Sequence, residues 1–465
     1  MSAGTKTAAA RFADIVGDTH SVQDSASLAA YTIDARQPSV AVRPGSSEQV
    51  AEIVKRASVE RLAIVPVGAR TKLAIGLPPR QYDIALDLTR LNRIIAYDPD
   101  DLTLSVEAGV TLRELAKVLA EHRQLLPLAV PFFDRATVGG TIASGVDSPL
   151  RQYYGTARDY VRGIEFVTGE GTPAKSGGRV VKNVTGYDLH KLMIGALGTL
   201  GVITKINFRT FPSPFETRAF VANFDTAERA LAMRALVARS PVTPITMEIF
   251  SPGTADLLYS APPAQIERHA IAPGLISNDS WSLTSGVAGT AQTLDRCEAE
   301  FRQMASQTGA LGTTVLGPDQ IPGVFGRKRE FIPIALASSS AATILKVSVL
   351  PSRMKDALAE IAGAARNNSL RWAAMARGVG IIYAALLPDS LGDDWCARTV
   401  RTANQIQVSV ARAEGHGTIP WCPSEWKSSL SVWGADPSDL PQMRALKAVF
   451  DPHGILSPGR FVGGI

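Results

Sequence analysis

"TVGGTIASGVDSPLRQYYGTARDYV", which runs from Thr137 to Val161, is the stretch that decides the fold. It sets glycines and other small residues between two apolar runs, and it contains neither histidine nor cysteine. Glycine lets backbone N–H groups approach an anion closely and supplies the positive φ angles of anion-binding turns. The stretch therefore predicts a place where an anionic ligand lies directly against the main chain.

Three further segments of the N-terminal half have the same character. Each combines glycines with small or hydroxyl residues next to an expected strand, and any one of them alone would indicate only a turn. Four within one half of a chain predict a diphosphate-binding site. The three segments are "VPVGARTKLAIG" (65–76), "GRVVKNVTGYDL" (178–189) and "GALGTLGVIT" (195–204).

The spacing of these glycines excludes the two commonest nucleotide motifs. A GxGxxG run after a first strand, typical of Rossmann domains, is missing, and so is the GxxxxGK[ST] run of P-loop proteins. "GALGTLG" spaces its glycines as GxxGxxG instead. A ligand with a diphosphate is still indicated, but neither NAD on a Rossmann domain nor ATP on a P-loop fits.

Composition narrows the class of protein. A chain of 465 residues predicts at least two domains, and its net charge of +5 contains no long basic block of the kind that binds nucleic acid. Three widely separated cysteines, Cys297, Cys396 and Cys422, argue against a metal cluster or a disulfide framework. No signal peptide or transmembrane run is visible, so we expect a cytoplasmic protein. We expect any association with the inner membrane to occur only through partner proteins.

The organisation changes at about residue 215. Before it, a βαβ-like unit over 39–67 is followed by short strands and the glycine-rich segments. After it, repeated strand–helix–strand units predict an antiparallel sheet with helices on one face. The segment "IPWCPSEWKSSLSVWG" (419–434) breaks this pattern. We therefore expect an N-terminal domain over 1–214, a cap over 215–420 and a C-terminal segment, 421–465, that returns to the first domain.

Five segments, in order, carry a resemblance to a known family. Over Pro38 to Pro214 and 451–465 the chain resembles the FAD-binding domain of the vanillyl-alcohol oxidase and p-cresol methylhydroxylase superfamily. Within it the chain is most similar to the FAD-binding E subunit of glycolate oxidases, and more distantly to the D subunit and to D-2-hydroxyacid dehydrogenases. The segments are "VPVGARTKLAIG", "ATVGGTIASG", "YGTARDYVRGIEFVTGEG", "RVVKNVTGYDLHKLMIGALGTLGVIT" and "FDPHGILSPGRF".

The resemblance implies an α+β fold, with a two-part FAD-binding domain of the p-cresol methylhydroxylase type and an α+β, ferredoxin-like cap domain. It also implies FAD as the cofactor. Relatives that bind FAD covalently use a histidine or cysteine near the flavin, and none lies between His122 and His190 or in the loop at 65–76. We therefore expect non-covalent FAD.

The resemblance assigns residues to each part of FAD. In the diphosphate loop the family usually has glycines where Ala69 and Arg70 stand here, so Arg70 either adds a phosphate contact or blocks one. Arg158 and Asp159 have a simpler alternative, a local ion pair. The implied flavin and diphosphate residues are Thr137, Val138, Gly139, Gly140, Ala143, Gly145 and Ser148. The implied diphosphate loop is Pro66, Gly68, Ala69, Arg70, Thr71 and Lys72. The residues implied to hold or support the adenosine half are Tyr154, Gly155, Arg158, Asp159, Gly198, Gly201, Val202 and Ile203.

Catalytic residues are harder to assign. Metal-dependent relatives hold a divalent ion with histidines in a GHxGDGNxH-like strand, but the corresponding "ARGVGIIYAAL" has no histidine, so we expect no metal. "RAEGHGTIP" keeps Glu414 and His416 of a second family motif, and His416 is a candidate base or else a structural residue.

A hydroxy-acid substrate needs a cation for its carboxylate. The candidates are Lys346, inside an alternating strand, and Arg327, Lys328 and Arg329 in "FGRKREF". The alternatives are an outward, solvated lysine and a solvated loop. We take Arg329 and Lys346 as the catalytic cations beside His416.

The resemblance implies an FAD-dependent oxidoreductase that oxidises a 2-hydroxy acid such as glycolate or D-lactate. Its partners would be a second flavoprotein subunit and an iron–sulfur subunit that receive electrons. Two alternatives stay open: a flavin-binding or electron-relay subunit without substrate chemistry, which the missing metal histidines favour, and a stand-alone flavoenzyme for another alcohol. A shared fold does not decide among them.

Overall fold

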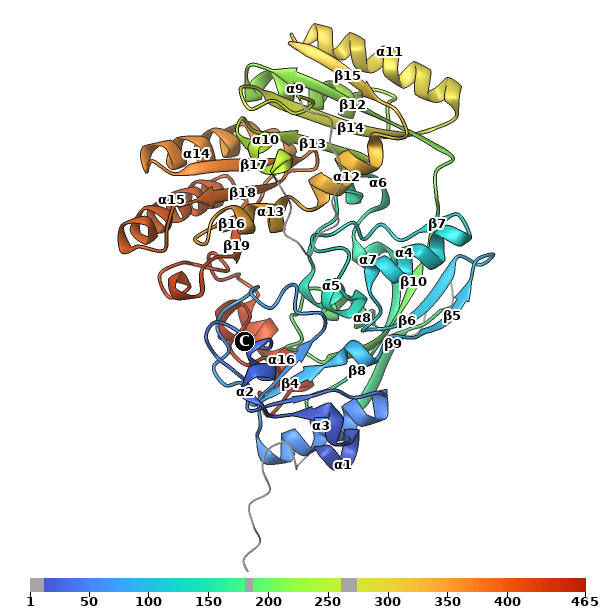
Figure 1. The fold of residues 1–465 in the computed structure, drawn as a ribbon, viewed down its shortest axis with the longest axis vertical. Helices are drawn as coiled ribbons and strands as arrows, with labels where there is room; N and C mark the ends of the chain where they lie inside the picture. Colours follow the sequence, from blue (N-terminus) through green and yellow to red (C-terminus); the bar gives the residue numbers. More distant parts are fainter. Residues whose placement is uncertain (1–11, 180–186, 261–273) are drawn as a thin grey trace, which may run out of the picture.

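The protein is described here from a computed structural model, which covers residues 12–179, 187–260 and 274–465. Figure 1 shows two parts stacked along the long axis. The lower part holds the N-terminal elements together with the C-terminal helix, and the upper part is built around one large sheet. Residues 180–186, which belong to one of the glycine-rich segments, lie outside the described residues.

A small sheet opens the lower part. Strands β2, β4 and β3 are parallel, and β1 pairs antiparallel at the edge. Helix α3 connects β2 to β3, which confirms the predicted βαβ unit, and Ser46 precedes the helix and accepts the Gln49 N–H through its hydroxyl. The elements are β1 (Ser21–Val22), β2 (Val40–Val42), α3 (Ser47–Glu60), β3 (Ile64–Val67) and β4 (Ile84–Asp87).

A five-stranded antiparallel sheet, in the order β5-β6-β10-β8-β9, forms the rest of the lower part. Helix α5 (Val138–Ser144) docks onto the end of β6, because the Val138 and Gly139 N–H groups donate to the Val110 and Ala108 carbonyls at 2.8 Å. The other elements are β5 (Ile94–Asp98), β6 (Thr103–Glu107), α4 (Leu112–Glu121), α6 (Arg151–Tyr154), α7 (Ala157–Tyr160), β8 (Val161–Val167), β9 (Pro173–Gly177), α8 (His190–Met193) and β10 (Val202–Arg209).

The upper part, called the cap from here on, contains an antiparallel sheet of eight strands in the order β15-β12-β14-β13-β17-β18-β16-β19. Its strands are β12 (Glu216–Phe224), β13 (Thr246–Phe250), β14 (Trp281–Gly289), β15 (Gly312–Leu316), β16 (Thr343–Ser348), β17 (Arg371–Arg377), β18 (Ile381–Leu387) and β19 (His416–Trp421).

Helices cover both faces of the cap sheet, whereas the sequence predicted helices on one face. Strand β18 is buried along its whole length, so it needs cover on both sides. The first face carries α9 (Ala227–Arg239), α11 (Ala291–Gln307), α14 (Met354–Asn367) and α15 (Asp393–Arg412). The second face carries α10 (Thr254–Tyr259), α12 (Ile321–Arg329) and α13 (Phe331–Ser338), and part of it meets the lower part.

The C-terminal segment returns to the lower part after β19. The Ile64 N–H donates to the Ile455 carbonyl and the Ser457 N–H donates to the Ile64 carbonyl, each at 2.8 Å, so this segment extends the small parallel sheet. Helix α16 (Leu440–Phe450), drawn in red in Figure 1, lies beside the N-terminal elements.

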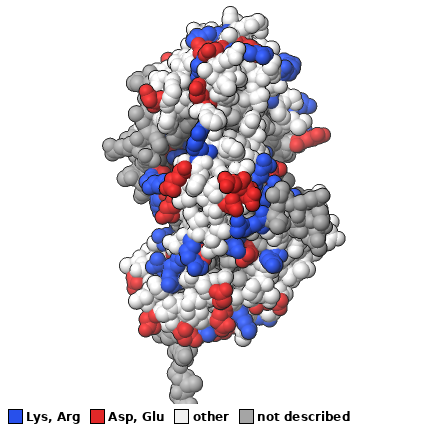
Figure 2. Space-filling view, turned by 90° about the vertical axis from the view of Figure 1, so that its right-hand side faces the viewer, with Lys and Arg blue, Asp and Glu red and all other residues white. Residues whose placement is uncertain are grey.

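Charged side chains of both signs are interspersed over the face in Figure 2, with no single-sign region spanning it. Within the described ranges, none of the helices is both long and apolar enough to cross a membrane.

Candidate cofactor and substrate site

Four cavities follow helix α5 from the interior of the lower part to the cap. We call them the inner, loop, wide and tryptophan cavities, and neighbours share lining residues, so they form one track. The inner cavity is lined by residues that include Leu88, Ala108, Gly139, Gly201 and Ile203. The loop cavity is lined by residues that include Gly68, Arg70, Lys72, Gly140 and Arg460. The wide cavity, of about 360 Å³, is lined by residues that include Asp147, Arg151, Arg158 and Lys346. The tryptophan cavity, of about 90 Å³, is lined by residues that include Lys346, Tyr383, Trp421 and Trp433.

The two adjacent glycines of α5, Gly139 and Gly140, have different structural roles. A Cβ at Gly139 would lie 2.6 Å from the Ala108 Cβ and 2.9 Å from its carbonyl, so Gly139 is required for packing against β6. A Cβ at Gly140 would meet only the Thr137 hydroxyl, at 3.0 Å, and otherwise points into the loop and inner cavities. Gly140 therefore keeps the cavity floor open.

Two cations that line the loop cavity, Lys72 and Arg460, have no carboxylate within ion-pair distance among the described residues. The Lys72 ammonium contacts the Thr71 hydroxyl at 3.4 Å, and desolvation lowers the pKa of Lys72 to about 7, against the charge of Glu330. Among the described residues, the Nε of the buried Arg460 has no hydrogen-bond partner, and burial lowers the pKa of this guanidinium as well. Such groups are costly unless an anion meets them. This cavity suits a diphosphate.

Arg70 does not fill the loop cavity. Its backbone has a φ of +64°, so it adopts the left-handed conformation for which a glycine would be usual. Its guanidinium lies over the Tyr31 ring at 4.8 Å and 3.8 Å from the Asp87 carboxylate. The loop therefore keeps its turn despite the substitution, and Arg70 lines the cavity from one side.

Two buried cations of the C-terminal segment clamp the turn that follows this loop. Lys427 donates to the carbonyls of Ala74 and Gly76 at 2.7 and 2.8 Å and pairs with Asp34 at 2.7 Å. Arg460 donates to the carbonyls of Leu73 and Ile75, at 2.5 and 2.7 Å. Four consecutive carbonyls, 73–76, are thereby held by residues distant in sequence. We call this arrangement the carbonyl clamp.

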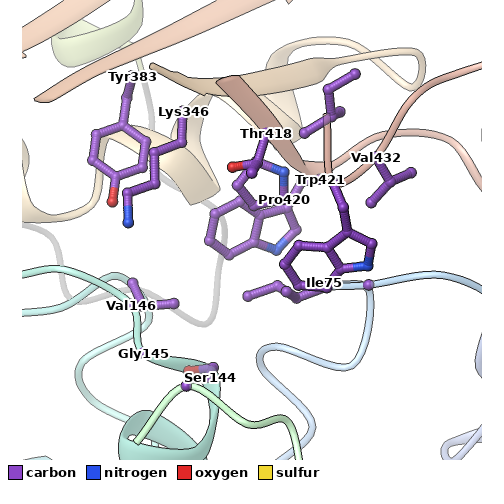
Figure 3. Close-up of a pocket in the computed structure, with 14 residues that line it drawn as sticks. Ile75, Ser144, Gly145, Val146, Lys346, Tyr383, Thr418, Pro420, Trp421 and Val432 are labelled. Atoms are coloured by element: carbon purple, nitrogen blue, oxygen red, sulfur yellow. The ribbon is translucent and has the colours of Figure 1, made fainter. Parts of the chain in front are cut away.

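On the cap side, a cross-strand row faces the track. Lys346 on β16 pairs in register with Tyr383 on β18 and with Thr418 on β19, so their side chains share one face of the sheet. Figure 3 shows the Lys346 and Tyr383 side chains pointing toward Val146 and Gly145, at the end of α5. The predicted alternative of an outward, solvated lysine is therefore wrong: Lys346 lines both the wide and the tryptophan cavities.

Lys346 is a desolvated cation. Burial lowers the pKa of its ammonium, and the nearby Arg377 and Arg151 lower it further, whereas the Asp147 charge opposes the shift. Across the described ranges, no carboxylate lies within ion-pair distance of this ammonium. Desolvation also raises the pKa of the Tyr383 phenol, which therefore stays protonated at neutral pH.

Asp147 is already neutralised. Its carboxylate is shared by Arg377, in a buried pair, and by Arg151 at 3.0 Å. Because Asp147 follows α5 and Arg377 belongs to β17, the pair ties the cap to the lower part. Glu330 makes a second tie, accepting the N–H groups of Phe132 and Phe133 at 2.7 and 3.2 Å.

Most predicted cofactor residues line the track, and four do not. Val138 and Val202 are buried in the core one position away from lining residues. Tyr154 packs edge-on against Phe211 at 5.0 Å. Asp159 caps α7 by accepting the Thr156 N–H at 2.6 Å, and Arg158 donates to the Lys191 carbonyl, so the contacts differ from the local ion pair considered as an alternative.

The structure also divides the set assigned to the adenosine half. Gly198, Gly201 and Ile203 line the inner cavity, whereas Gly155 and Arg158 line the wide cavity next to Lys346. The two groups are separated along α5 and line different cavities. These residues belong to neighbouring segments of the sequence, but in the fold the residues at the two ends line different cavities.

The remaining predicted catalytic residues lie away from the track. His416 is exposed at the outer end of β19 and lines none of the four cavities. The Arg327–Arg329 triplet belongs to α12 and not to a solvated loop. Lys328 forms a buried pair with Glu248, and Arg329 pairs with Glu330 at 2.9 Å over the Phe133 ring. Arg329 is therefore neutralised where it stands.

Several functional residues were not anticipated: the track residues Asp147, Tyr383, Trp421, Trp433 and Arg460, and Arg377, which pairs with Asp147. Arg460 and Asp147 lie within the quoted motifs, so their charge alone was a signal. Arg377 sits in an otherwise apolar strand, which is a signal for a buried cation that needs a partner. Tyr383 and the tryptophans carried no local signal.

The chain's residues fit FAD in three respects. The loop cavity offers a diphosphate Lys72 and Arg460, which have no carboxylate partner among the described residues. Gly140 presents no side chain to the floor of this cavity, and the inner cavity is apolar enough for an aromatic base. Comparison with known families agrees. Residues 38–177 match the family described as FAD binding domain, and residues 213–381 with 432–461 match the C-terminal domain of FAD linked oxidases.

The chain is an FAD-dependent oxidoreductase of the FAD linked oxidase family. Its fold is similar over 97% of the chain and 96% of the other to p-cresol methylhydroxylase with substrate bound, with a TM-score of 0.78 at 19% identity. The fold class predicted from the sequence is thereby confirmed.

Curated relatives of this oxidoreductase include glycolate oxidase subunits. Subunit GlcD of Bacillus subtilis is 24% identical over 98% of this chain and 97% of its own length. Subunit GlcE of Escherichia coli is 36% identical, over 36% of this chain and 48% of its own length. A D-2-hydroxyglutarate dehydrogenase of Xanthomonas citri is 25% identical over 90% of this chain and 88% of its own.

We expect this oxidoreductase to hold FAD without a covalent bond. None of the described residues that line the four cavities is a histidine or a cysteine. Precipitation with acid should release all flavin into the supernatant. Flavin that stays with the precipitated polypeptide would contradict this expectation.

FAD affinity should depend on Lys72. The apoprotein holds this group partly neutral near pH 7, because its pKa is about 7, whereas a diphosphate favours the ammonium. FAD binding above pH 7 therefore takes up a proton, and the Kd of FAD should rise with pH, by at most about tenfold per pH unit. Titrating the apoprotein with FAD from pH 6 to 9 measures this slope. Lys72→Met should bind more weakly with a flatter pH profile, and an equal slope in both proteins would contradict the role of Lys72.

Proposed function

We propose that this chain oxidises 2-hydroxy acids and that Lys346 binds the substrate carboxylate. The supporting observation is the desolvated Lys346 ammonium, which lacks a paired carboxylate among the described residues and lines both cavities where the cap meets α5. A buried cation of this kind is costly unless an anion pairs with it, and a substrate carboxylate would form that pair. Relatives named glycolate oxidase subunit and D-2-hydroxyglutarate dehydrogenase are consistent with such a substrate.

The reaction would convert the 2-hydroxy acid to a 2-oxo acid. When bound, FAD would accept the hydride from the carbinol carbon, and the hydroxyl proton would be released to solvent. Lys346 and the protonated Tyr383 phenol, neighbours across β16 and β18, would hold the carboxylate oxygens from the cap side. The apolar walls exclude water and strengthen these contacts. Thr418, in the same row, offers a hydroxyl beside them.

This arrangement requires that the cap and the lower part keep a fixed position relative to each other. The Arg377–Asp147 pair and the Glu330 contacts hold them together, so Lys346 stays aimed at the end of α5. FAD would lie along the track, with its diphosphate in the loop cavity. Its adenosine would occupy the inner cavity and its flavin ring the end near Gly145 and Val146.

We further propose that electrons leave to partner subunits, since two relatives are named as subunits of a larger oxidase. A second flavoprotein subunit and an iron–sulfur subunit are the expected partners, and membrane association would depend on them. The competing function is a flavin-binding relay without substrate chemistry. It is favoured by the exposed position of His416, which leaves the track without a histidine among the described residues.

Anaerobic mixing of the purified, FAD-loaded chain with 2-hydroxy acids separates these two functions. An enzyme should lose its oxidised-flavin absorbance and form one 2-oxo acid per flavin. A relay should stay oxidised with every acid and become reduced only when the partner subunits are added.

A further inference from the structure

The segment that interrupts the cap's strand–helix pattern forms one wall of the tryptophan cavity. Pro420 and Trp421 come from the end of β19, and Val432 and Trp433 come from the chain that folds back beside it. Ile75 of the lower part completes the wall, as Figure 3 shows. The proposed function gives these residues no role, although they lie across the cavity from Lys346.

This wall is preformed. The Ile419 N–H donates to the Val432 carbonyl at 2.8 Å, which pins the returning chain to β19. The Trp433 indole N–H donates to the Arg460 carbonyl at 3.2 Å, and its ring packs edge-on against Phe461 at 5.0 Å. The carbonyl clamp, through Lys427, holds the middle of the segment. An apolar group that enters the cavity therefore meets surfaces already in place.

The wall offers no second charge. Among the residues that line the tryptophan cavity, Lys346 alone carries a formal charge, and the rest are apolar or neutral. One carboxylate can be paired there, and a second one would be buried against indole and aliphatic carbon at a high cost.

The cations of the wide cavity do not change this. Arg151 is held at 3.0 Å by Asp147, and Arg158 donates to the Lys191 carbonyl at 3.2 Å. A second substrate carboxylate would have to share Arg151 with Asp147 or reach Arg158, which is exposed to solvent, and neither arginine lines the tryptophan cavity. Apolar substituents need no such partner.

From this arrangement we propose that the site selects 2-hydroxy acids with an apolar side chain, aromatic or branched aliphatic, over glycolate and over hydroxy acids with a second carboxylate. The proposal rests on the proposed function, because it takes Lys346 as the carboxylate anchor. Each methylene buried in such a wall is worth about 0.8 kcal/mol, or about fourfold in kcat/KM. A phenyl or isobutyl group should therefore bring about 10²-fold over glycolate.

The test compares phenyllactate, 2-hydroxyisocaproate, glycolate and 2-hydroxyglutarate, as racemates where chiral, by anaerobic flavin reduction. A parallel titration follows the perturbation of flavin absorbance by phenylacetate, acetate and glutarate, which lack the reacting hydroxyl. We expect the two apolar hydroxy acids to react at least about tenfold more efficiently than the other two, and phenylacetate to bind most tightly.

Substitutions test whether the apolar wall of the tryptophan cavity determines the substrate preference. Trp433→Ala should lower the ratio of phenyllactate to glycolate about tenfold, because its indole provides much of the contact surface. Trp395→Ala, on the remote helix α15, is the matched control and should leave the ratio unchanged. If Trp433→Ala folds poorly, the ratios of kcat/KM among the four hydroxy acids in the wild-type protein still test the proposed preference for apolar side chains.

Each result has one meaning. Equal or faster reaction with glycolate or 2-hydroxyglutarate overturns the apolar preference and leaves the proposed function standing. If no hydroxy acid reduces the flavin but phenylacetate binds in preference to acetate and glutarate, the proposed function fails and the cavity's selectivity stands. Absence of both reduction and binding preference overturns both.

Discussion

Gly140→Val is expected to yield a folded protein that does not retain FAD. The added side chain would project into the loop and inner cavities, because a Cβ at Gly140 has only the Thr137 hydroxyl within contact distance. Overpacking of a fitted site costs about 1–3 kcal/mol, or about 5- to 150-fold in Kd, and here the added side chain clashes with the cofactor itself. Flavin content after gel filtration, against thermal unfolding of the apoprotein, measures the two effects separately.

Two further variants make this result specific. Gly363→Val, in helix α14 where a Cβ meets nothing within 4 Å, should leave both flavin content and stability nearly unchanged. Gly139→Val should lower the stability of the apoprotein itself, since its Cβ would press on Ala108 of the sheet. A Gly140→Val protein with a full complement of flavin would show that the cofactor lies elsewhere.

Lys346→Met should keep FAD and lose substrate oxidation. Methionine fills a similar volume, but it leaves a buried carboxylate without its cation, and truncating one partner of such a pair costs about 2–5 kcal/mol. The expected loss is therefore about 10²-fold or more in kcat/KM for any 2-hydroxy acid that reduces the flavin. Anaerobic reduction rates across a range of substrate concentrations give the value.

Lys205→Met is the matched control, because Lys205 also lies within a strand but pairs with Glu165 at 2.7 Å, far along β10 from the cap. It should oxidise substrate like the original protein. Full activity in Lys346→Met would remove the carboxylate anchor from the mechanism, and Arg377 is already committed to Asp147, so the proposed site would have to be abandoned.

The cofactor-binding part could be predicted from the sequence because its signals are local. Thr137, Gly139 and Gly140 form the first turn of one short helix, and the loop from Pro66 to Lys72 follows one strand, so each pattern is complete within a dozen residues. Where the motif continued across a longer range, as from Gly155 to Ile203, the order of residues did not indicate that its two ends line different cavities.

The substrate side could be predicted only in part, because it is assembled across strands. Lys346 was noticed for its charge, but its neighbours Tyr383 and Thr418 come from β18 and β19, whose register with β16 depends on the whole cap sheet. The reverse holds for Lys328 and Arg329, which were noticed for their charge but are paired with Glu248 and Glu330. Glu330 is the next residue in the chain, whereas Glu248 could not be assigned as a partner without the fold.

The carbonyl clamp bears on how the protein is made in the cell. The loop cavity is closed by Arg460, and the turn beside it is held by Arg460 and Lys427, so the cofactor site includes residues that the ribosome adds more than 350 positions after Leu73. Domains generally begin to fold from the N-terminal end while synthesis continues. The nascent lower part must therefore wait, with its diphosphate loop unsupported, until translation has passed residue 460. Loading with FAD is thus a late event of biogenesis, and a ribosome stalled within α16 should carry a chain that holds no flavin.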